Sequence, residues 1–506
     1  GYGSIMEITT PLGRYKQAYQ TYRPFSPIEQ GFAIRAKTED GRVMLRKLSR
    51  DDFDDIRFIG EYPIATIDYR TRDKPSLPVE VRCEVFSPFI PLNARDSSIP
   101  VTILQYTIKN PLRKAIEISI AGWLQNAVCL ELKDKIAGQS RNRVIKHKGL
   151  TSVHFDVVRS KQMIPQRQIV IFEDFEDGSY KKWQVAGEAF GTNPATGTFK
   201  NQQKVTGFNG KYFVNSFRGG SDQLQGKLTS KPFKITLPFI AFLIGGGNHP
   251  GKTCMNLVVE LEKVRKVVRS TTGKNDERLE LAYWDVKEFI GKKGYLEIID
   301  HESGGWGHIN IDHIYFTNLP PDWIGRIEKD HPQLGDMTLS VLDANATATA
   351  DWSTKHLVGL QQAFSEDLAD DGKLTLVKQK QYPLGEKRCG AVASTFMLKA
   401  GQAKKIVFLI SWYFPNRCQS NKPVKWGEKS GVGQLVGNMY ANWFNNSLEV
   451  AEYVAENLQR LHDDTFLFRN TYFDTTLPYW FVHRIAMPLA NLATETCQWW
   501  KNGRFW

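Results

Sequence analysis

The sequence predicts a mainly β fold, in which one β-sandwich is interrupted by a second, jelly-roll-like β-sandwich and is followed by helices. Apolar and polar residues alternate over short runs, for example at 78–86, 101–108 and 405–412, and a period of two is typical of half-buried strands. Glycine and proline stand between these runs, as expected of turns. From about position 434 the apolar residues recur every three or four positions, which indicates helices.

Changes in composition divide the 506 residues into four segments. A Gly-dense segment in the middle, which holds Gly219-Gly220 and Gly245-Gly246-Gly247, separates two strand-rich flanks. Because insertions at loop tips are well tolerated, we expect the flanks to form one sandwich and the middle segment to be a module inserted into it. The predicted boundaries are 1–167 and 320–432 for the two parts of the flanking sandwich, 168–319 for the module and 433–506 for the helices.

Composition and charge indicate an ordinary globular protein. Hydrophobic residues make up 41% and charged residues 24% of the chain, so it can bury cores without disulfides or metals. The formal net charge is +12, but the densest basic stretch, Lys263–Lys266, is short. The charge therefore favours solubility, with an anionic membrane or nucleic acid as the weaker alternative, and we predict no nucleic-acid partner.

Cysteine spacing and apolar runs exclude several classes. The cysteines at 83, 129, 254, 389, 418 and 497 form no C-x-x-C pair, which predicts reduced, buried thiols. The longest apolar run, Pro238–Ile244, is too short for a transmembrane helix. The first residues contain no apolar signal-peptide core, and the pattern indicates neither a compartment nor an oligomeric state.

One short motif points to nucleotides. Residues 246–253 match the phosphate-binding pattern G-x-x-x-x-G-K-[ST]. That loop functions between a buried strand and a helix, whose N-terminal N–H groups hold the phosphates. The strand is present at 239–244, whereas the residues after Thr253 are β-branched. A structural glycine turn is therefore the favoured interpretation, and nucleotide binding is the distant alternative.

The Gly-dense segment carries motifs of its own, at Asp174-Phe175-Glu176, Val214–Phe217, Phe242–Cys254 and Gly304–His313. In these motifs it resembles the β-sandwich module of levanase-like glycoside hydrolases of family 32, over nearly all of 170–318. The resemblance implies a β-turn where the phosphate-binding pattern matches, and this weakens the nucleotide interpretation.

The same resemblance suggests a carbohydrate site in the module. Trp306 is the candidate for stacking against a sugar ring, and His249 or Asn248 for hydrogen bonding to its hydroxyl groups. A module that only supports an enzyme is an equally weighted alternative, because a fold does not by itself define a function.

Three acidic residues, Glu173, Asp174 and Asp312, are candidate ligands of a structural calcium ion, since oxygen ligands from separate strands suit calcium. No dense D-x-D-x-D loop is present, so a solvated acidic edge is the favoured alternative. His308 and His313 give only a weak metal signal. No other cofactor is predicted.

Two apolar helices are expected near the end of the chain, over Tyr440–Leu461 and over Phe481–Leu492. Asp474 is predicted to cap the N-terminus of the second helix, because Asp is favoured at that position. Pro488 is expected to kink it.

The flanks carry a second and more extensive set of motifs: Glu84–Pro91, Asp96–Val101, Phe408–Asn416, Gly437–Ala441, Phe473–Trp480 and Thr496–Arg504. In their order, these motifs resemble the amino-terminal sandwich of glycoside hydrolase family 116 and the entry into its (α/α)6 catalytic barrel. This family contains β-glucosidases and non-lysosomal glucosylceramidases. The likeness covers most of the chain outside the module, and the helices would be the first of a truncated barrel.

The resemblance implies an activity. Family members are retaining glycosidases that act on β-glucosides, glucosylceramide among them, and retention requires two carboxyl groups about 5–5.5 Å apart. The family's nucleophile follows the segment that matches Gly503-Arg504, and its acid/base lies further on, so both are expected beyond Trp506. We therefore assign no catalytic residue and expect this amino-terminal portion to be inactive alone. The alternative is a glycan-binding protein whose module recognises carbohydrate.

Overall fold

The computed structural model describes residues 28–71, 76–133, 135–159, 166–261, 264–323, 325, 327, 329–352, 367–418, 435–486, 488–489 and 497–505. The chain divides into two compact units. Unit 1 consists of Gly1–Gln162 and Arg326–Trp506, and unit 2 of Met163–Gly325. Lys263, Leu492 and Trp506, which the sequence predictions name, lie outside the described residues.

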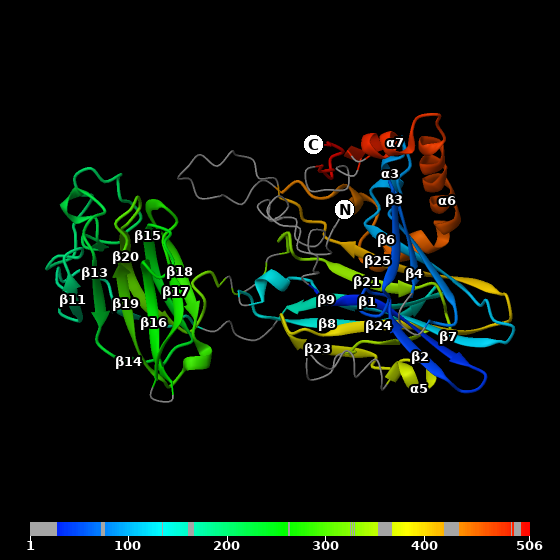
Figure 1. The fold of residues 1–506 in the computed structure, drawn as a ribbon, viewed down its shortest axis with the longest axis horizontal. Helices are drawn as coiled ribbons and strands as arrows, with labels where there is room; N and C mark the ends of the chain where they lie inside the picture. The colour runs from blue at the N-terminus through cyan, green and yellow to red at the C-terminus, as the bar shows by residue number, and fades with distance from the viewer. Residues whose placement is uncertain are drawn as a thin grey trace. The chain divides into compact units, whose positions relative to one another are not determined.

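Unit 1 is a sandwich of two antiparallel sheets (Figure 1). The order of the nine-stranded sheet is β23 (Gln379–Pro383), β8 (Gly138–His147), β9 (Leu150–Arg159), β21 (Asp336–Val341), β25 (Ala403–Tyr413), β6 (Val101–Lys109), β5 (Glu80–Phe86), β4 (Ile64–Arg70) and β3 (Asp55–Glu61). The order of the five-stranded sheet is β2 (Val43–Lys47), β1 (Gln30–Thr38), β7 (Ile116–Gln125), β24 (Cys389–Leu398) and β22 (Thr347–Thr349). Two short helices, α3 (Ala94–Ser97) and α5 (Ala369–Asp371), lie in the connections.

The core of unit 1 lies between these sheets. Ile34 and Ile118 of the five-stranded sheet share one cluster of buried apolar side chains with Tyr106 and Phe408 of the nine-stranded sheet. The ring of Phe32 lies 5.3 Å from that of Tyr106 and 5.1 Å from that of Phe408. Burial of this apolar surface is the main favourable contribution to folding.

Strand β25 is buried on both faces. Ile406 and Phe408 point into the core between the sheets, whereas Val407 and Leu409 belong to a second apolar cluster on the other side. A strand covered on both faces is a near-continuous apolar run. The alternating residues seen in the sequence, such as Ile406 and Phe408, form only one of the two apolar faces of the strand.

The two flanks of unit 2 build both sheets together. β21, which follows unit 2 in the chain, pairs with β9, which precedes it. In the same way β25 pairs with β6, and β24 pairs with β7 from Cys389 opposite Gln125 to Leu398 opposite Ile116. Each sheet thus contains strands from both sides of the interruption.

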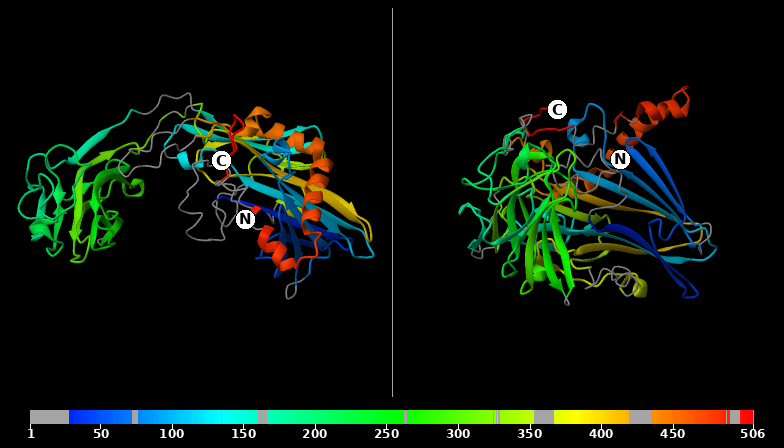
Figure 2. Two further views of the ribbon diagram at one scale, coloured as in Figure 1. Left: turned by 90° about the horizontal axis from the view of Figure 1, so that it is seen from above. Right: turned by 60° about the vertical axis from the view of Figure 1, so that its left-hand side comes forward.

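The longest helix that the structure describes, α6 (Ser447–Phe473), packs on β25 and β21 (Figure 2). Its start is fixed by a reciprocal cap. The Asn446 side chain accepts the backbone N–H of Glu449 at 2.9 Å and donates to Glu449 Oε1 at 3.0 Å, an arrangement that satisfies otherwise unpaired N-terminal groups. Val450 and Val454 then extend the second apolar cluster.

A buried carboxylate fixes the middle of α6. Asp96 in α3 accepts hydrogen bonds from Tyr453 Oη at 2.8 Å and from Arg460 Nη1 at 2.7 Å, both on α6, and from Asn93 Nδ2 at 2.7 Å. Burial opposes ionisation of Asp96, but the bonds from Arg460 and Tyr453 outweigh it and hold its pKa below the usual value. Asp96 is therefore a charged anchor between α3 and the helix.

The second predicted helix exists as α7 (Tyr479–Ala486), but its predicted cap is wrong. Asp474 is the C-cap of α6, and its backbone N–H donates to the Asn470 carbonyl at 2.9 Å. α7 begins directly after Pro478, which suits a helix start because proline has no N–H to leave unpaired. Pro488 lies beyond Ala486, the last residue of α7, and the predicted kink falls where residues 487 and 490–496 lie outside the described residues.

Unit 2 is a second two-layer sandwich (Figure 2). One sheet has the order β10 (Ile169–Glu173), β20 (Ile309–Thr317), β15 (Phe239–Gly246) and β18 (Asp276–Asp285), with β12 (Val214–Asn215) beside β20. The other has the order β11 (Trp183–Gly187), β13 (Gly226–Ser230), β19 (Lys293–Asp300), β16 (Thr253–Leu261) and β17 (Val264–Thr271), with β14 (Phe233–Lys234) beside β19. Phe242 and Trp284 of the first layer meet Leu257 and Ile298 of the second in one buried cluster. The predicted mainly β fold class is confirmed.

The first and last strands of unit 2 are neighbours. β10 pairs with β20, so that Ile169 lies opposite Thr317. The Asn318 side chain accepts the N–H of Gln168 at 2.7 Å and donates to the Gln166 carbonyl at 2.9 Å. The chain therefore enters and leaves unit 2 at one place, as suits a module carried in a loop.

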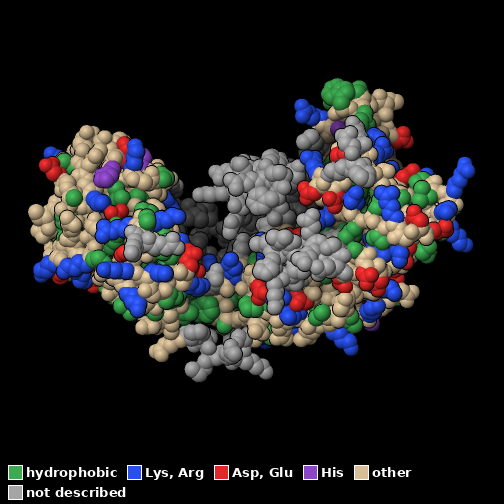
Figure 3. All heavy atoms as spheres, turned by 60° about the horizontal axis from the view of Figure 1, so that its bottom comes forward, with side chains coloured by type: hydrophobic (Ala, Val, Ile, Leu, Met, Phe, Trp, Pro, Cys, Tyr) green, Lys and Arg blue, Asp and Glu red, His purple; other side chains and the backbone are tan. Residues whose placement is uncertain are grey.

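Both signs of charge lie on one face of the molecule. On the face drawn in Figure 3, Lys and Arg side chains alternate with Asp and Glu rather than gathering in one patch. None of the helices that the structure describes is long and apolar enough to cross a membrane.

Loss of the Asp96 anchor should weaken unit 1. We expect Asp96→Ala to lower its free energy of unfolding by about 2 kcal/mol, because hydrogen bonds to a charged group contribute ~1.5–3 kcal/mol and Arg460 can turn to water. Urea denaturation measures this change. Asp463→Ala, at an exposed position of the same helix, is the control and should change stability by less than about 0.5 kcal/mol; equal effects would contradict the anchor.

Candidate functional site

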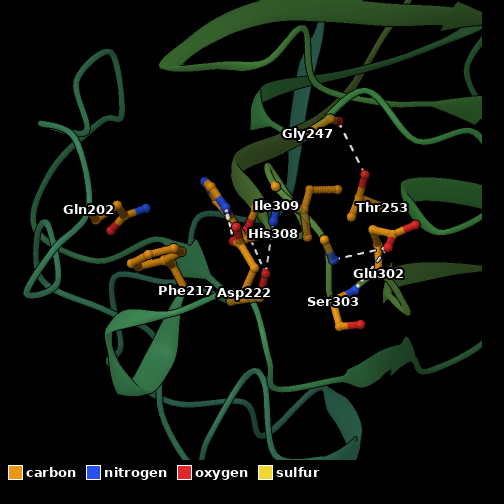
Figure 4. A network of polar contacts seen from close by, with 12 residues as sticks. Gln202, Phe217, Asp222, Gly247, Thr253, Glu302, Ser303, His308 and Ile309 are labelled. Atoms are coloured by element: carbon orange, nitrogen blue, oxygen red, sulfur yellow. Dashed lines mark hydrogen bonds and ion pairs between the residues drawn. The ribbon is translucent and has the colours of Figure 1, made fainter.

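A buried histidine joins three segments at one end of unit 2 (Figure 4). His308 Nδ1 lies 2.7 Å from Asp222 Oδ1, and His308 Nε2 lies 3.0 Å from Glu277 Oε1. The other oxygen of Glu277 accepts hydrogen bonds from Asn310 Nδ2 at 2.7 Å and from Gln202 Nε2 at 3.0 Å. Only the protonated imidazole donates from both nitrogens, so the geometry favours the charged ring.

The electrostatics agree with this geometry. Burial disfavours the charged form of His308, but the hydrogen bonds and charges of Glu277 and Asp222 outweigh it and raise the pKa of the imidazole above its usual value. The ring is held as an imidazolium between two carboxylates. It is a clamp rather than a base, because no nitrogen is left to accept a proton.

Trp306 stacks on this clamp. Its ring lies 5.7 Å from the His308 ring at an interplanar angle of 25°, while Phe217 meets His308 edge-on at 4.9 Å. Trp306 is half-buried, so one ring face is backed by the imidazolium while part of the side chain meets solvent. Gly247 makes room, since a Cβ there would clash with the Trp306 carbonyl oxygen.

The structure brings two of the three candidate sugar-binding residues together. His249 Nε2 lies 3.2 Å from the carbonyl oxygen of Gly305, the residue before Trp306. Asn248 is exposed in the same loop as His249, but its side chain accepts a hydrogen bond from Thr272 Oγ1 at 2.9 Å. Asn248 therefore supports the loop, whereas His249 and Trp306 border a common surface.

A second buried acid lies beneath this surface. Asp300 is 0% exposed, and neither carboxylate oxygen makes a hydrogen bond of ordinary geometry. Burial raises the pKa of Asp300 to about 7, although the nearby Ser216 hydroxyl and Glu302 N–H favour its charged form. An unpaired buried charge is costly, so this carboxyl is mostly protonated below about pH 7.

The phosphate-binding interpretation is wrong. Residues 246–253 form the turn between β15 and β16, so a strand stands where a P-loop needs a helix. Lys252 pairs with Glu302 at 2.8 Å, and Thr253 Oγ1 donates to the Gly247 carbonyl at 3.2 Å. The glycines serve the turn, as the favoured interpretation predicted.

The calcium candidates are engaged with protein groups. Glu173 is buried and accepts a hydrogen bond from Trp183 Nε1 at 3.2 Å, Asp174 accepts the N–H of Glu176 at 3.2 Å, and Asp312 accepts the N–H of Asn209 at 2.7 Å. Within the described ranges, no three His, Cys, Asp or Glu side chains gather as a metal site requires. The calcium prediction therefore rests on the sequence pattern alone.

Sequence reasoning missed most of the clamp. The sequence gives only a weak metal signal at His308, and no motif in it points to Asp222 or Glu277. They lie 86 and 31 residues from His308 in the chain, so no local spacing reveals them. The usable signal was the Gly-dense motif 304–313, which contains both His308 and Trp306.

Fold and site together define a class: a mainly β protein with two sandwich units, one of which carries a half-buried tryptophan stacked on a buried histidine. Comparison with protein families gives the more specific assignment. The family model described as "beta-glucosidase 2, glycosyl-hydrolase family 116 N-term" matches residues 10–221 and 323–461. The chain therefore belongs to glycoside hydrolase family 116, and the resemblance found in the sequence is confirmed.

A curated relative also points to glycoside hydrolases. The chain is 43% identical over 152 residues to an Aspergillus rugulosus protein named "Putative glycosyl hydrolase ecdE". The match covers 29% of this chain and 21% of that protein. The chain thus matches about a fifth of the relative's length.

Solved structures give low scores. A mutant of the CBM29-2 carbohydrate-binding module is 11% identical, with a TM-score of 0.19, covering 30% of this chain and 93% of its own. TmCBM61 in complex with β-1,4-galactotriose is 17% identical, with a TM-score of 0.20, covering 29% and 94%. The K1 adhesin domain of Lys-gingipain from Porphyromonas gingivalis W83 is 12% identical, with a TM-score of 0.20, covering 31% and 99%. Scores this low carry no argument about the present chain.

Unit 2 should lose stability as the pH rises. Burial raises the pKa of Asp300 and Asp312 from the ordinary 3.8 to about 7. Between these values the folded state binds more protons than the unfolded state, so stability falls from about pH 4 to about pH 7. Asp300→Asn cannot ionise and should recover about 2–4 kcal/mol at pH 8, since one pKa unit corresponds to ~1.4 kcal/mol.

Calorimetry of the unit 2 transition at a series of pH values measures this recovery. Asp285→Asn, at an exposed position of the same unit, is the control and should keep the wild-type decline. A decline of equal size in Asp300→Asn would contradict the assignment.

Proposed function

We propose that the protein to which this chain belongs hydrolyses β-glucosides, such as β-linked oligosaccharides or glucosylceramide-like lipids, with retention of anomeric configuration. The observation that carries the proposal is the family match at 10–221 and 323–461, which covers most of unit 1 and reaches into the first part of unit 2. Retention proceeds through a nucleophilic carboxylate and an acid/base carboxyl about 5–5.5 Å apart. No organic cofactor is needed, since these two groups transfer the glycosyl unit and the proton.

Within this proposal, unit 1 has a supporting role. Its two sheets bury a shared core, and the nine-stranded sheet carries α6 in a position fixed by Asp96 and by the Asn446 cap. A helix anchored in this way would hold following helices in register. No residue of unit 1 is assigned to the chemistry.

We predict that this 506-residue chain does not hydrolyse 4-nitrophenyl β-glucoside, whereas a form extended by the following residues of its gene does. The physical reason is that the two catalytic carboxyls are expected outside the chain. Product release is followed by absorbance, and NMR of the first-formed sugar tests retention. Hydrolysis by the chain alone would show that its own carboxylates catalyse. If the extended form is folded but does not hydrolyse the substrate, the glucosidase proposal is wrong.

A second candidate function is glycan binding by unit 2. The observation that favours it is Trp306, which is half-buried, backed by the His308 ring at 5.7 Å and bordered by the His249 loop. A held aromatic ring is a ready surface for a sugar ring, because little conformational freedom is lost on binding. This function is compatible with a hydrolase elsewhere in the protein.

The prediction for this second function is that Trp306→Ala weakens binding of a β-linked gluco-oligosaccharide at least about tenfold, as expected for loss of an aromatic anchor. Isothermal titration calorimetry measures the affinity. Trp480→Ala is the matched control, because Trp480 is 70% exposed in unit 1 and should leave binding unchanged. Equal affinity of Trp306→Ala and the parent chain would exclude this surface.

A further inference from the structure

The groups around Trp306 form a device that responds to protons. We propose that protonation of Asp300 and His308 holds the loop carrying Trp306 in its binding conformation, so that unit 2 retains an oligosaccharide more tightly in acid than in alkali. The inference rests on the proposed glycan-binding function and adds the control of that site.

The first part of the device is the clamp. His308 bridges Asp222, which precedes β13, and Glu277, which lies on β18, at 2.7 and 3.0 Å. If the imidazole loses a proton, one of the two carboxylates faces a nitrogen lone pair instead of a donor. The bridge then opens on that side, and the ring that backs Trp306 is no longer held.

The second part is Asp300, at the end of β19. It lies opposite Gly226 on one side and Thr253 on the other, and both of its oxygens are buried without a hydrogen bond. Asp222 is near enough to oppose its ionisation, while His308 favours it. Because burial of a carboxylate is costly and the Ser216 hydroxyl and Glu302 N–H do not outweigh it, binding a proton is the favourable way to neutralise this group.

The third part is the loop that begins directly after Asp300. Three glycines, Gly304, Gly305 and Gly307, give it freedom to move. Polar contacts tie it to neighbouring segments of unit 2. Gln223 Nε2 donates to the Ser303 carbonyl at 3.2 Å, Lys252 pairs with Glu302 at 2.8 Å, the His301 N–H donates to the Lys252 carbonyl at 2.8 Å, and His249 Nε2 lies 3.2 Å from the Gly305 carbonyl. When Asp300 ionises, its carboxylate oxygens require water. We expect the loop to move away from Asp300 and admit that water.

Other charged groups face the same loop. Lys252 and the backbone N–H groups of the loop hold the pKa of Glu302 at about 2, so the Lys252–Glu302 pair keeps its charges from about pH 5 to about pH 8. His249 also faces the loop through the Gly305 carbonyl, and His249→Gln separates its contribution. His301 is an exposed titratable side chain of the loop itself, and His301→Gln separates its contribution in the same way. The response that remains in these two variants belongs to Asp300 and His308.

Hydrogen exchange of the whole 506-residue chain tests the device without a ligand. The protection factors of 301–308, which correct for the intrinsic pH dependence of exchange, should fall about tenfold or more from pH 5 to pH 8, as one or more pKa units of coupling implies. Asp300→Asn should lose less protection between pH 5 and pH 8 than the parent chain does, and the loss that remains belongs to His308. His308→Gln should have low protection at both values.

Asp312→Asn is the matched control. Asp312 is equally buried, and burial likewise raises its pKa to about 7, but it binds the backbone of Asn209 and His313 rather than the Trp306 loop. This variant should keep the wild-type loss of protection at 301–308. If His308→Gln does not fold, the comparison of Asp300→Asn with Asp312→Asn decides the question.

Titration with cellotetraose at pH 5 and pH 8 separates the two levels of the proposal. Tighter binding at pH 5 by about tenfold in the parent chain, with a smaller pH effect in Asp300→Asn, is the expected result. Equal protection and equal affinity at both pH values would overturn the proton control alone. Loss of protection without binding at pH 5 would overturn the glycan-binding function on which the control rests.

Discussion

The structure depends on strand pairing between two stretches of chain that unit 2 separates. β21 lies between β9 and β25, and β24 joins β7, so neither flank can complete a sheet without the other. Unit 2 must therefore return the chain to its starting point. It does so because its first and last strands pair, Ile169 opposite Thr317, with Asn318 bonded to both Gln168 and Gln166. Loop closure then costs little more than a short connection would.

Polar groups have different roles in the two units. In unit 1 the buried carboxylate of Asp96 is charged, because it accepts hydrogen bonds from Tyr453 and Arg460 on α6 and from Asn93, the N-cap of α3. In unit 2 Asp300 has no such donors and stays protonated to about pH 7. The same residue type thus anchors a helix in one unit and provides proton sensitivity in the other. The surroundings, more than the sequence position, decide the charge state.

The sequence predicts the strands well where periodicity acts locally. The run 405–412 lies within β25, and the Gly-rich turn at 246–253 lies between two strands. Prediction from the sequence fails where the deciding contact joins residues that are far apart in the chain or depends on where the chain turns. Asp474 ends α6 instead of starting α7, because capping depends on where the chain turns. The clamp was missed for the same reason, since His308 finds its partners only when β18, β20 and the loop before β13 converge. Burial of Asp300 has no sequence signature at all.

The central claim is that both flanks form one family 116 sandwich, into which unit 2 is inserted as a separate module. The most direct test is to replace 166–321 by a short Gly/Ser linker, since the ends of this segment lie side by side. The account predicts a folded protein with β-type circular dichroism and a cooperative transition, whose midpoint lies within a few degrees of that of unit 1 in the full chain. An unfolded or aggregated product would contradict the account, because it would show that the flanks need unit 2 to pair.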